Sequence, residues 1–103
     1  MKNMNQLMKQ AKKLQDDMTK AQELLGTMTV TGTAGGNAVT IQMNGHRKVI
    51  NVQIDPATVD HDDIEMLEDL ILTAIQDADK RVDALTEEQM GKYTKGLNIP
   101  GLF

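Results

Sequence analysis

The chain has 103 residues, a formal net charge of −4 at pH 7, and neither cysteine nor serine. This length accommodates one domain with a small core. The missing cysteine excludes disulfides and thiolate metal sites, and the two commonest nucleophiles of covalent catalysis are both absent. No apolar run approaches the roughly 20 residues of a membrane span, and no signal-peptide pattern occurs near the first residue. We therefore expect a cytoplasmic protein that does not contact membranes.

Charge is distributed unevenly along the chain. Residues 1–25 and 26–54 each carry a net charge of +2, whereas residues 55–90 carry −10. A local field, rather than the net charge of the whole protein, attracts a charged ligand. The first half of the chain is therefore a candidate for nucleic-acid binding despite the negative total.

A heptad pattern of apolar residues predicts a helix over residues 1–26. The steps between these residues alternate between three and four, which keeps one stripe of the helix facing another helix along its whole length. Gly26 then suits a helix terminus. The pattern leaves open whether the stripe packs within one chain or between two. This stripe, the apolar seam, consists of Met4, Leu7, Ala11, Leu14, Met18, Ala21 and Leu25.

Five lysines lie away from the apolar seam, on the predicted outer face of the same helix. With Met4 at heptad position a, they fall at positions b, c and f, where lysine often serves only to keep a helix soluble. Clustering favours a further role, because four of them precede the first acidic residue. Lysine binds phosphate as a point charge and reads no sequence by itself. The five are Lys2, Lys9, Lys12, Lys13 and Lys20.

Three strands are predicted next, at residues 27–33, 38–44 and 47–54. Threonine and valine dominate the first strand, and apolar residues alternate with polar ones in the other two. Asn44-Gly45 is a strong hairpin signal between the second and third strands. We expect an antiparallel meander with one apolar face that another element must cover. The alternating apolar residues are Val39, Ile41, Met43, Ile50, Val52 and Ile54.

A second helix is predicted over residues 62–90, because apolar residues again recur at helical spacing after acids that favour a helix N-terminus. Both helices would be near 40 Å long at about 1.5 Å per residue, whereas a strand of about seven residues spans roughly 23 Å. The helices must overhang the sheet, and a second copy would cover the exposed seams. We expect one domain over residues 1–90, a helix stop at Gly91, and a flexible tail over residues 91–103.

Candidate catalytic and metal-binding groups are few. His46 and His61 lack a third ligand at a zinc-site spacing. Asp60, Asp62 and Asp63 lack the spacing of a calcium loop, and helix capping explains them better. We therefore expect no enzyme activity, cofactor, bound metal or small-molecule substrate.

Six short motifs spread over the whole chain carry a family resemblance. They are Met-Lys-Gln-Ala-Lys-Lys-Leu-Gln at residues 8–15, Gly-Thr-Ala-Gly-Gly at 32–36, Met-Asn-Gly at 43–45, Val-Gln-Ile-Asp-Pro at 52–56, Glu-Met-Leu-Glu-Asp-Leu at 65–70 and Pro-Gly-Leu-Phe at 100–103. With these motifs in this order and spacing, the chain resembles the YbaB/EbfC nucleoid-associated proteins. The resemblance implies a small α+β fold, of the two-layer α/β kind, forming homodimers with projecting helices. It also implies binding to double-stranded DNA with little sequence specificity, altered DNA conformation, and a part in nucleoid organisation and gene regulation.

For the DNA contacts, the resemblance implies the basic first helix and the arms formed by the end of the second helix and the tail. The hairpin adds two further cations that could compete with the arms. The candidate residues are Lys2, Lys9, Lys12, Lys13, Lys20, Arg47, Lys48, Lys80, Arg81, Lys92 and Lys95.

A second class of function stays open at this point. The chain could be an interaction module for a protein of DNA repair or replication. A partner would then dock on the apolar seam or on the apolar tail residues Leu97, Ile99, Leu102 and Phe103.

Overall fold

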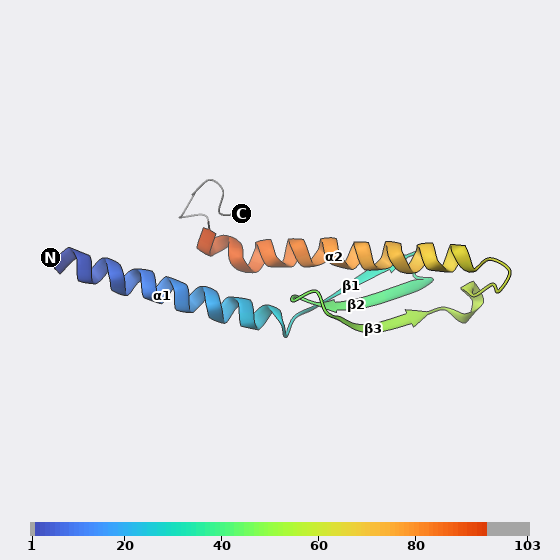
Figure 1. Cartoon of the computed structure of the whole chain (residues 1–103), viewed down its shortest axis with the longest axis horizontal. Coiled ribbons are helices and arrows are strands. Elements are labelled where there is room, and N and C mark those ends of the chain that lie inside the picture. Colours follow the sequence, from blue (N-terminus) through green and yellow to red (C-terminus); the bar gives the residue numbers. More distant parts are fainter. Residues whose placement is uncertain (1, 95–103) are drawn as a thin grey trace.

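The computed structural model describes residues 2–94, which form two long helices and a three-stranded antiparallel sheet (Figure 1). This arrangement confirms the expected α+β fold class. None of the described helices contains an apolar stretch sufficient to cross a membrane. In chain order the elements are α1 (Lys2–Leu25), β1 (Thr29–Ala34), β2 (Val39–Asn44), β3 (Val49–Ile54), a short 3-10 helix η1 (Pro56–Thr58) and α2 (Ile64–Thr94).

The central strand β2 provides the sheet's share of the core. The strand order is β1-β2-β3. Val39, Ile41 and Met43 are buried, and the alternate residues of β2 are at least partly exposed, as a period of two predicts. Helix α2 packs across β1 and β2. Its buried contributions to the same core are Ala74, Ala78 and Val82.

Small residues let α2 lie very close to β1. A Cβ added at Gly32 would collide with the carbonyl oxygen of Ala74 and the backbone nitrogen of Ala78. Beside this contact, the Thr33 N–H donates a hydrogen bond of 2.9 Å to Oδ2 of Asp77. Helix α2 therefore lies directly on the face of β1, and Asp77 also occupies one backbone N–H of this strand.

Strand β3 differs from the sequence prediction, because most of its apolar side chains are exposed and only Ile54 packs against the core. Val52 lies opposite Ile41 and so belongs to the core face of the sheet. Nevertheless Ile50 is 54% exposed and Val52 is 48% exposed. Helix α2 packs mainly on β1 and β2, so it leaves most of the apolar face of β3 exposed.

The turn between β2 and β3 is wider than the Asn44-Gly45 signal predicts. The Arg47 N–H donates to the Asn44 carbonyl oxygen at 2.9 Å, and Arg47 has a φ of 64°. This left-handed residue is typical of a three-residue hairpin loop that ends in a bulge. The predicted start of the third strand at residue 47 is therefore wrong, and β3 begins at Val49.

Both ends of α2 differ from the predicted range of 62–90. Asp63 accepts a hydrogen bond from the Met66 N–H at 3.3 Å and so caps a helix that begins at Ile64. At the other end the helix continues through Gly91 to Thr94. Glycine costs a helix interior only about 1 kcal/mol relative to alanine, and the buried side chain of Met90 anchors this segment. Gly91 is therefore not a stop, and the rest of the predicted tail, residues 95–103, lies outside the described residues.

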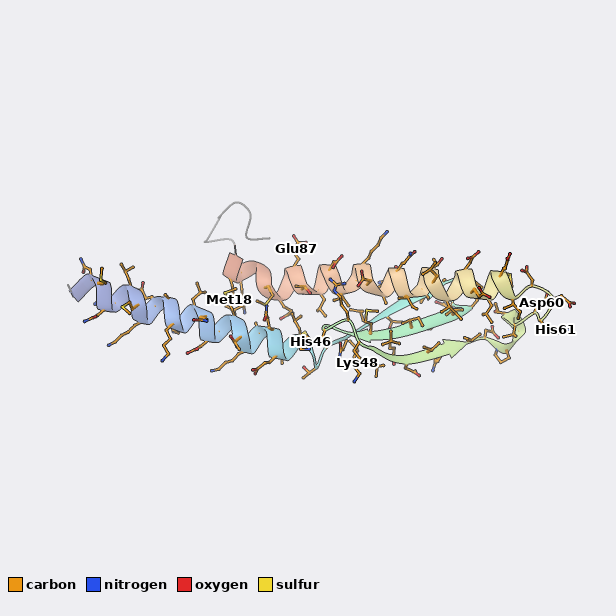
Figure 2. The ribbon with its side chains drawn as sticks, in the orientation of Figure 1. Met18, His46, Lys48, Asp60, His61 and Glu87 are labelled. Atoms are coloured by element: carbon orange, nitrogen blue, oxygen red, sulfur yellow. The ribbon has the colours of Figure 1, made fainter. Side chains whose placement is uncertain are left out.

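Helix α1 packs against the C-terminal half of α2 through part of the apolar seam. The seam residues from Leu14 to Leu25 are half-buried or buried, and Figure 2 shows Met18 between the two helices. The seam residues from Met4 to Ala11 are exposed, because α1 extends past the end of α2 (Figure 1). In its second half, therefore, the seam packs within one chain.

Candidate nucleic-acid interface

The outer face of α1 presents a row of lysine side chains to solvent. Lys9, Lys12, Lys13 and Lys20 are all exposed, and they cover about 17 Å of the helix at 1.5 Å per residue. Within residues 2–94, none of these four lysines forms an ion pair. Their charge is therefore available to a ligand.

The lysine row lies far from most of the acidic residues. Residues 2–15 contain no carboxylate, since the first acid of α1 is Asp16. Figure 2 places Asp60 and His61 at the opposite end of a molecule that is 73 Å long. Charges in solution are screened over roughly 8 Å at physiological ionic strength. The acids at the start of α2 therefore do not weaken the field around the first half of α1.

Arg47, one of the predicted DNA contacts, is held by acids of α2. Its guanidinium forms ion pairs with Asp79 and Asp83, and it also donates to the Asp79 carbonyl oxygen at 3.1 Å. Hydrogen bonds to Asp83 and Asp79 raise the pKa of Arg47 above its ordinary value. The two carboxylates more than balance its charge, so Arg47 ties the β2–β3 hairpin to α2.

Arg81 and Lys80 lie beside another acid of α2. Nε of Arg81 is 3.2 Å from Oδ2 of Asp77, the oxygen that also accepts the Thr33 N–H. The Thr33 N–H, and next to it the Arg81 guanidinium, lower the pKa of Asp77 below its ordinary value of 3.8, with a smaller contribution from Lys80. Arg81 is therefore already paired with a carboxylate on its own helix.

The remaining predicted contacts are scattered. Lys48 is exposed on the hairpin, and the Lys92 amine lies 5.1 Å from the ring centre of Tyr93, near the end of α2. The side chain of Lys2 and the whole of Lys95 lie outside the described residues. The structure thus brings together only the lysines of α1, and it separates the hairpin cations from them.

The arm of the molecule consists of α1 and residues 80–94 of α2. In the α2 part of the arm the three cations are matched by three carboxylates, those of Asp83, Glu87 and Glu88. This half of the arm therefore has no surplus charge. The surplus positive charge of the arm comes from α1.

The β2–β3 hairpin fixes the junction between α1 and the sheet. The Gly45 N–H donates to the carbonyl oxygens of Leu25 and Met28, both at 3.0 Å, and Nε2 of His46 donates to the Gln22 carbonyl oxygen at 2.7 Å. A Cβ at Gly45 would collide with the Leu25 carbonyl group. The sequence analysis did not predict this role of His46. The only sequence feature that points to it is the position of His46 directly after the Asn44-Gly45 turn. These contacts fix the orientation of α1, which carries the lysines, relative to the sheet.

Known proteins resemble this chain over most of its length. Residues 1–97 match the profile of the YbaB/EbfC DNA-binding family. A nucleoid-associated protein of Exiguobacterium sibiricum is 53% identical over 103 residues, which cover 100% of this chain and 97% of that protein. One from Bacillus thuringiensis is 54% identical over 101 residues, which cover 98% and 93%. In fold, the chain is similar to the crystal structure of an uncharacterized protein from Helicobacter pylori, with a TM-score of 0.72, 20% identity, and coverage of 85% and 92%. The chain therefore belongs to the YbaB/EbfC DNA-binding family.

Proposed function

We propose that this protein is a nucleoid-associated protein that binds double-stranded DNA through the outer face of α1. The observation that carries the proposal is the row of exposed lysines of α1, which form no ion pair within the described residues and lie at the opposite end of the molecule from the acids at the start of α2. Family membership supports DNA as the ligand. On this proposal the protein acts in the nucleoid, where it alters DNA conformation and contributes to nucleoid organisation and gene regulation.

The chemistry of the lysine row favours contact with the phosphate backbone. Lysine amines bind phosphates as point charges, and phosphate contacts position a protein without reading bases. The described part of α1 offers no arginine for bidentate contact with guanine. We therefore expect little sequence specificity, with weak preferences that arise from DNA shape and flexibility.

A homodimer would double the number of phosphate contacts, and the exposed strand β3 favours one. Among residues 2–94, β3 pairs with β2 alone, and its apolar side chains Val49, Ile50 and Val52 are exposed. An unpaired strand edge next to exposed apolar residues is the usual setting for pairing with another chain. We propose that two copies associate through β3, which leaves both arms free to contact separate stretches of one duplex.

The salt dependence of binding tests the contact with phosphates. A dimer with about four cations per subunit makes about eight phosphate contacts, and its affinity should fall roughly 10³- to 10⁵-fold between about 50 and 200 mM salt. The measurement is fluorescence anisotropy of a labelled duplex of about 30 base pairs, titrated with the protein at several salt concentrations.

A pair of charge-matched variants tests which face binds. The variant with Lys9, Lys12 and Lys13 all changed to Glu should lose binding. The control changes Lys48, Lys80 and Lys92 to Glu, which alters the net charge equally, and it should keep most of the affinity at 50 mM salt. Equal losses in both variants would contradict the assignment to α1. No binding by the unaltered protein even at 50 mM salt would contradict the DNA proposal itself and favour the protein-interaction module.

A further inference from the structure

The first half of α1 exposes an apolar stripe that DNA binding does not use. Met4, Leu7 and Met8 are 67%, 64% and 66% exposed, and Ala11 is exposed beside them. Met4, Leu7 and Ala11 continue the apolar seam, which faces away from the lysine row. Large apolar side chains exposed side by side on a soluble protein mark a surface that something covers.

The stripe begins where α2 ends. Helix α2 covers the seam from Leu25 back to Leu14, and the described part of α2 stops at Thr94, beside the middle of α1 (Figure 1). The chain then continues for nine residues, 95–103, which contain four large apolar side chains. The next apolar residues of the chain therefore follow the end of α2, which is where the seam on α1 becomes exposed.

We propose that residues 95–103 bind over the exposed stripe of α1 in their own chain and so complete the cover that α2 begins. The lengths are compatible, because Met4 to Ala11 spans about 10 Å of helix and nine residues reach up to roughly 30 Å. Attachment at Thr94 gives the segment a high effective concentration at the stripe, which favours it over a separate partner. The lysines of α1 lie on the other face and stay accessible. This inference does not depend on the DNA proposal.

A disulfide trap tests this contact directly, because the natural chain has no cysteine and any thiol is an engineered one. In the Leu7→Cys/Leu102→Cys variant, mild oxidation should form a disulfide within one chain, seen as a faster band on a non-reducing gel and as a linked peptide by mass spectrometry. The control, Lys9→Cys/Leu102→Cys, places the first thiol on the outer face and should form at least fivefold less intrachain product. Equal trapping in the two variants, or trapping only between chains, would overturn the proposal.

Hydrogen exchange provides a second measurement that needs no cysteine. Changing Leu97, Ile99, Leu102 and Phe103 together to serine should speed amide exchange over residues 4–11 severalfold. Residues 18–25, which pack on α2, should keep their rates and serve as the internal reference. Unchanged exchange over residues 4–11 would show that the tail does not cover the stripe. Neither experiment involves DNA, so failure of this proposal is distinguishable from failure of the DNA proposal.

Discussion

Arg47 shows how a residue with the right charge for DNA can have a different task. Its guanidinium is held by Asp79 and Asp83, so the hairpin cation faces acids of α2 before any ligand arrives. Arg47 occupies the left-handed position of the hairpin loop, and its side chain reaches the two acids on α2. The sequence alone predicted a phosphate contact here, because these acids are more than 30 positions away in the chain.

Arg47→Ala should lower the free energy of unfolding by about 1 kcal/mol, since exposed ion pairs contribute at most about that much each. Arg47→Lys should recover part of the loss, because one amine cannot bind both carboxylates. Urea denaturation measures both variants. In DNA titrations the salt dependence of Arg47→Ala should match that of the unaltered protein. A slope lower by about one would instead mean that Arg47 contacts a phosphate.

Asp77 makes stability depend on pH in the acid range. Its pKa is lowered in the folded protein, first by the Thr33 N–H and then by Arg81. Because the pKa of Asp77 is lower in the folded protein, its ionised carboxylate contributes its full stabilisation at any pH well above the ordinary pKa of 3.8. This contribution is lost as the pH falls below 3.8 and through the lower pKa of the folded state.

Asp77→Asn should therefore reduce the urea midpoint at pH 7, with a difference from the unaltered protein that shrinks as the pH falls below 3.8. Asp69→Asn is the matched control, because Asp69 is exposed and forms no ion pair within the described chain. A difference for Asp77→Asn that stays constant from pH 7 to pH 3 would show that the charge of Asp77 contributes nothing.

At the scale of elements, local patterns predicted most of the fold. The periods of 3.5 and 2 placed both helices and all three strands, and heptad register placed the lysine row on the outer face of α1. The lateral position of α2 could not be predicted, because it depends on Gly32 meeting Ala74 and Ala78 across the fold. The exposure of β3 and the pairing of Arg47 with Asp79 and Asp83 follow from that position, so the sequence did not indicate them either. Arg81 differs, because its partner Asp77 lies four residues earlier on the same helix.

Two glycine-to-alanine changes should move stability in opposite directions. At Gly32 a Cβ collides with the backbone of α2, so Gly32→Ala should cost about 1–3 kcal/mol as the helix is pushed off β1. At Gly91, inside α2, a Cβ would have no neighbour within 4 Å among the described residues outside the backbone of its own helix, so Gly91→Ala should stabilise the protein by about 0.5–1 kcal/mol. The urea midpoints of the two variants, compared with that of the unaltered protein, test both predictions. A destabilised Gly91→Ala variant would show that this position requires glycine.

For the whole molecule, β3 is the surface on which the proposed dimer depends. Val52→Asp places a charge on its apolar face and should convert the dimer to a monomer of 11.4 kDa in sedimentation velocity at micromolar concentration. Val59→Asp is the matched control, since Val59 is 49% exposed but lies after η1, outside the sheet. The unaltered protein sedimenting as a monomer would contradict the dimer, and Val52→Asp remaining dimeric would place the interface elsewhere.

The bond between β1 and Asp77 of α2 bears on how far such pairing can go. A sheet with two open edges can add copies at both sides and grow into a ribbon without a natural end. Here the Thr33 N–H of β1 is bonded to Asp77 of α2, whereas β3 carries exposed apolar residues, so the two edges of the sheet are not equivalent. In the proposed dimer both β3 edges are used, and the edges that stay outside are those of β1, each with one N–H already bonded to Asp77. The bond from Thr33 to Asp77 would in this way make further growth of the sheet at β1 less favourable than pairing at β3.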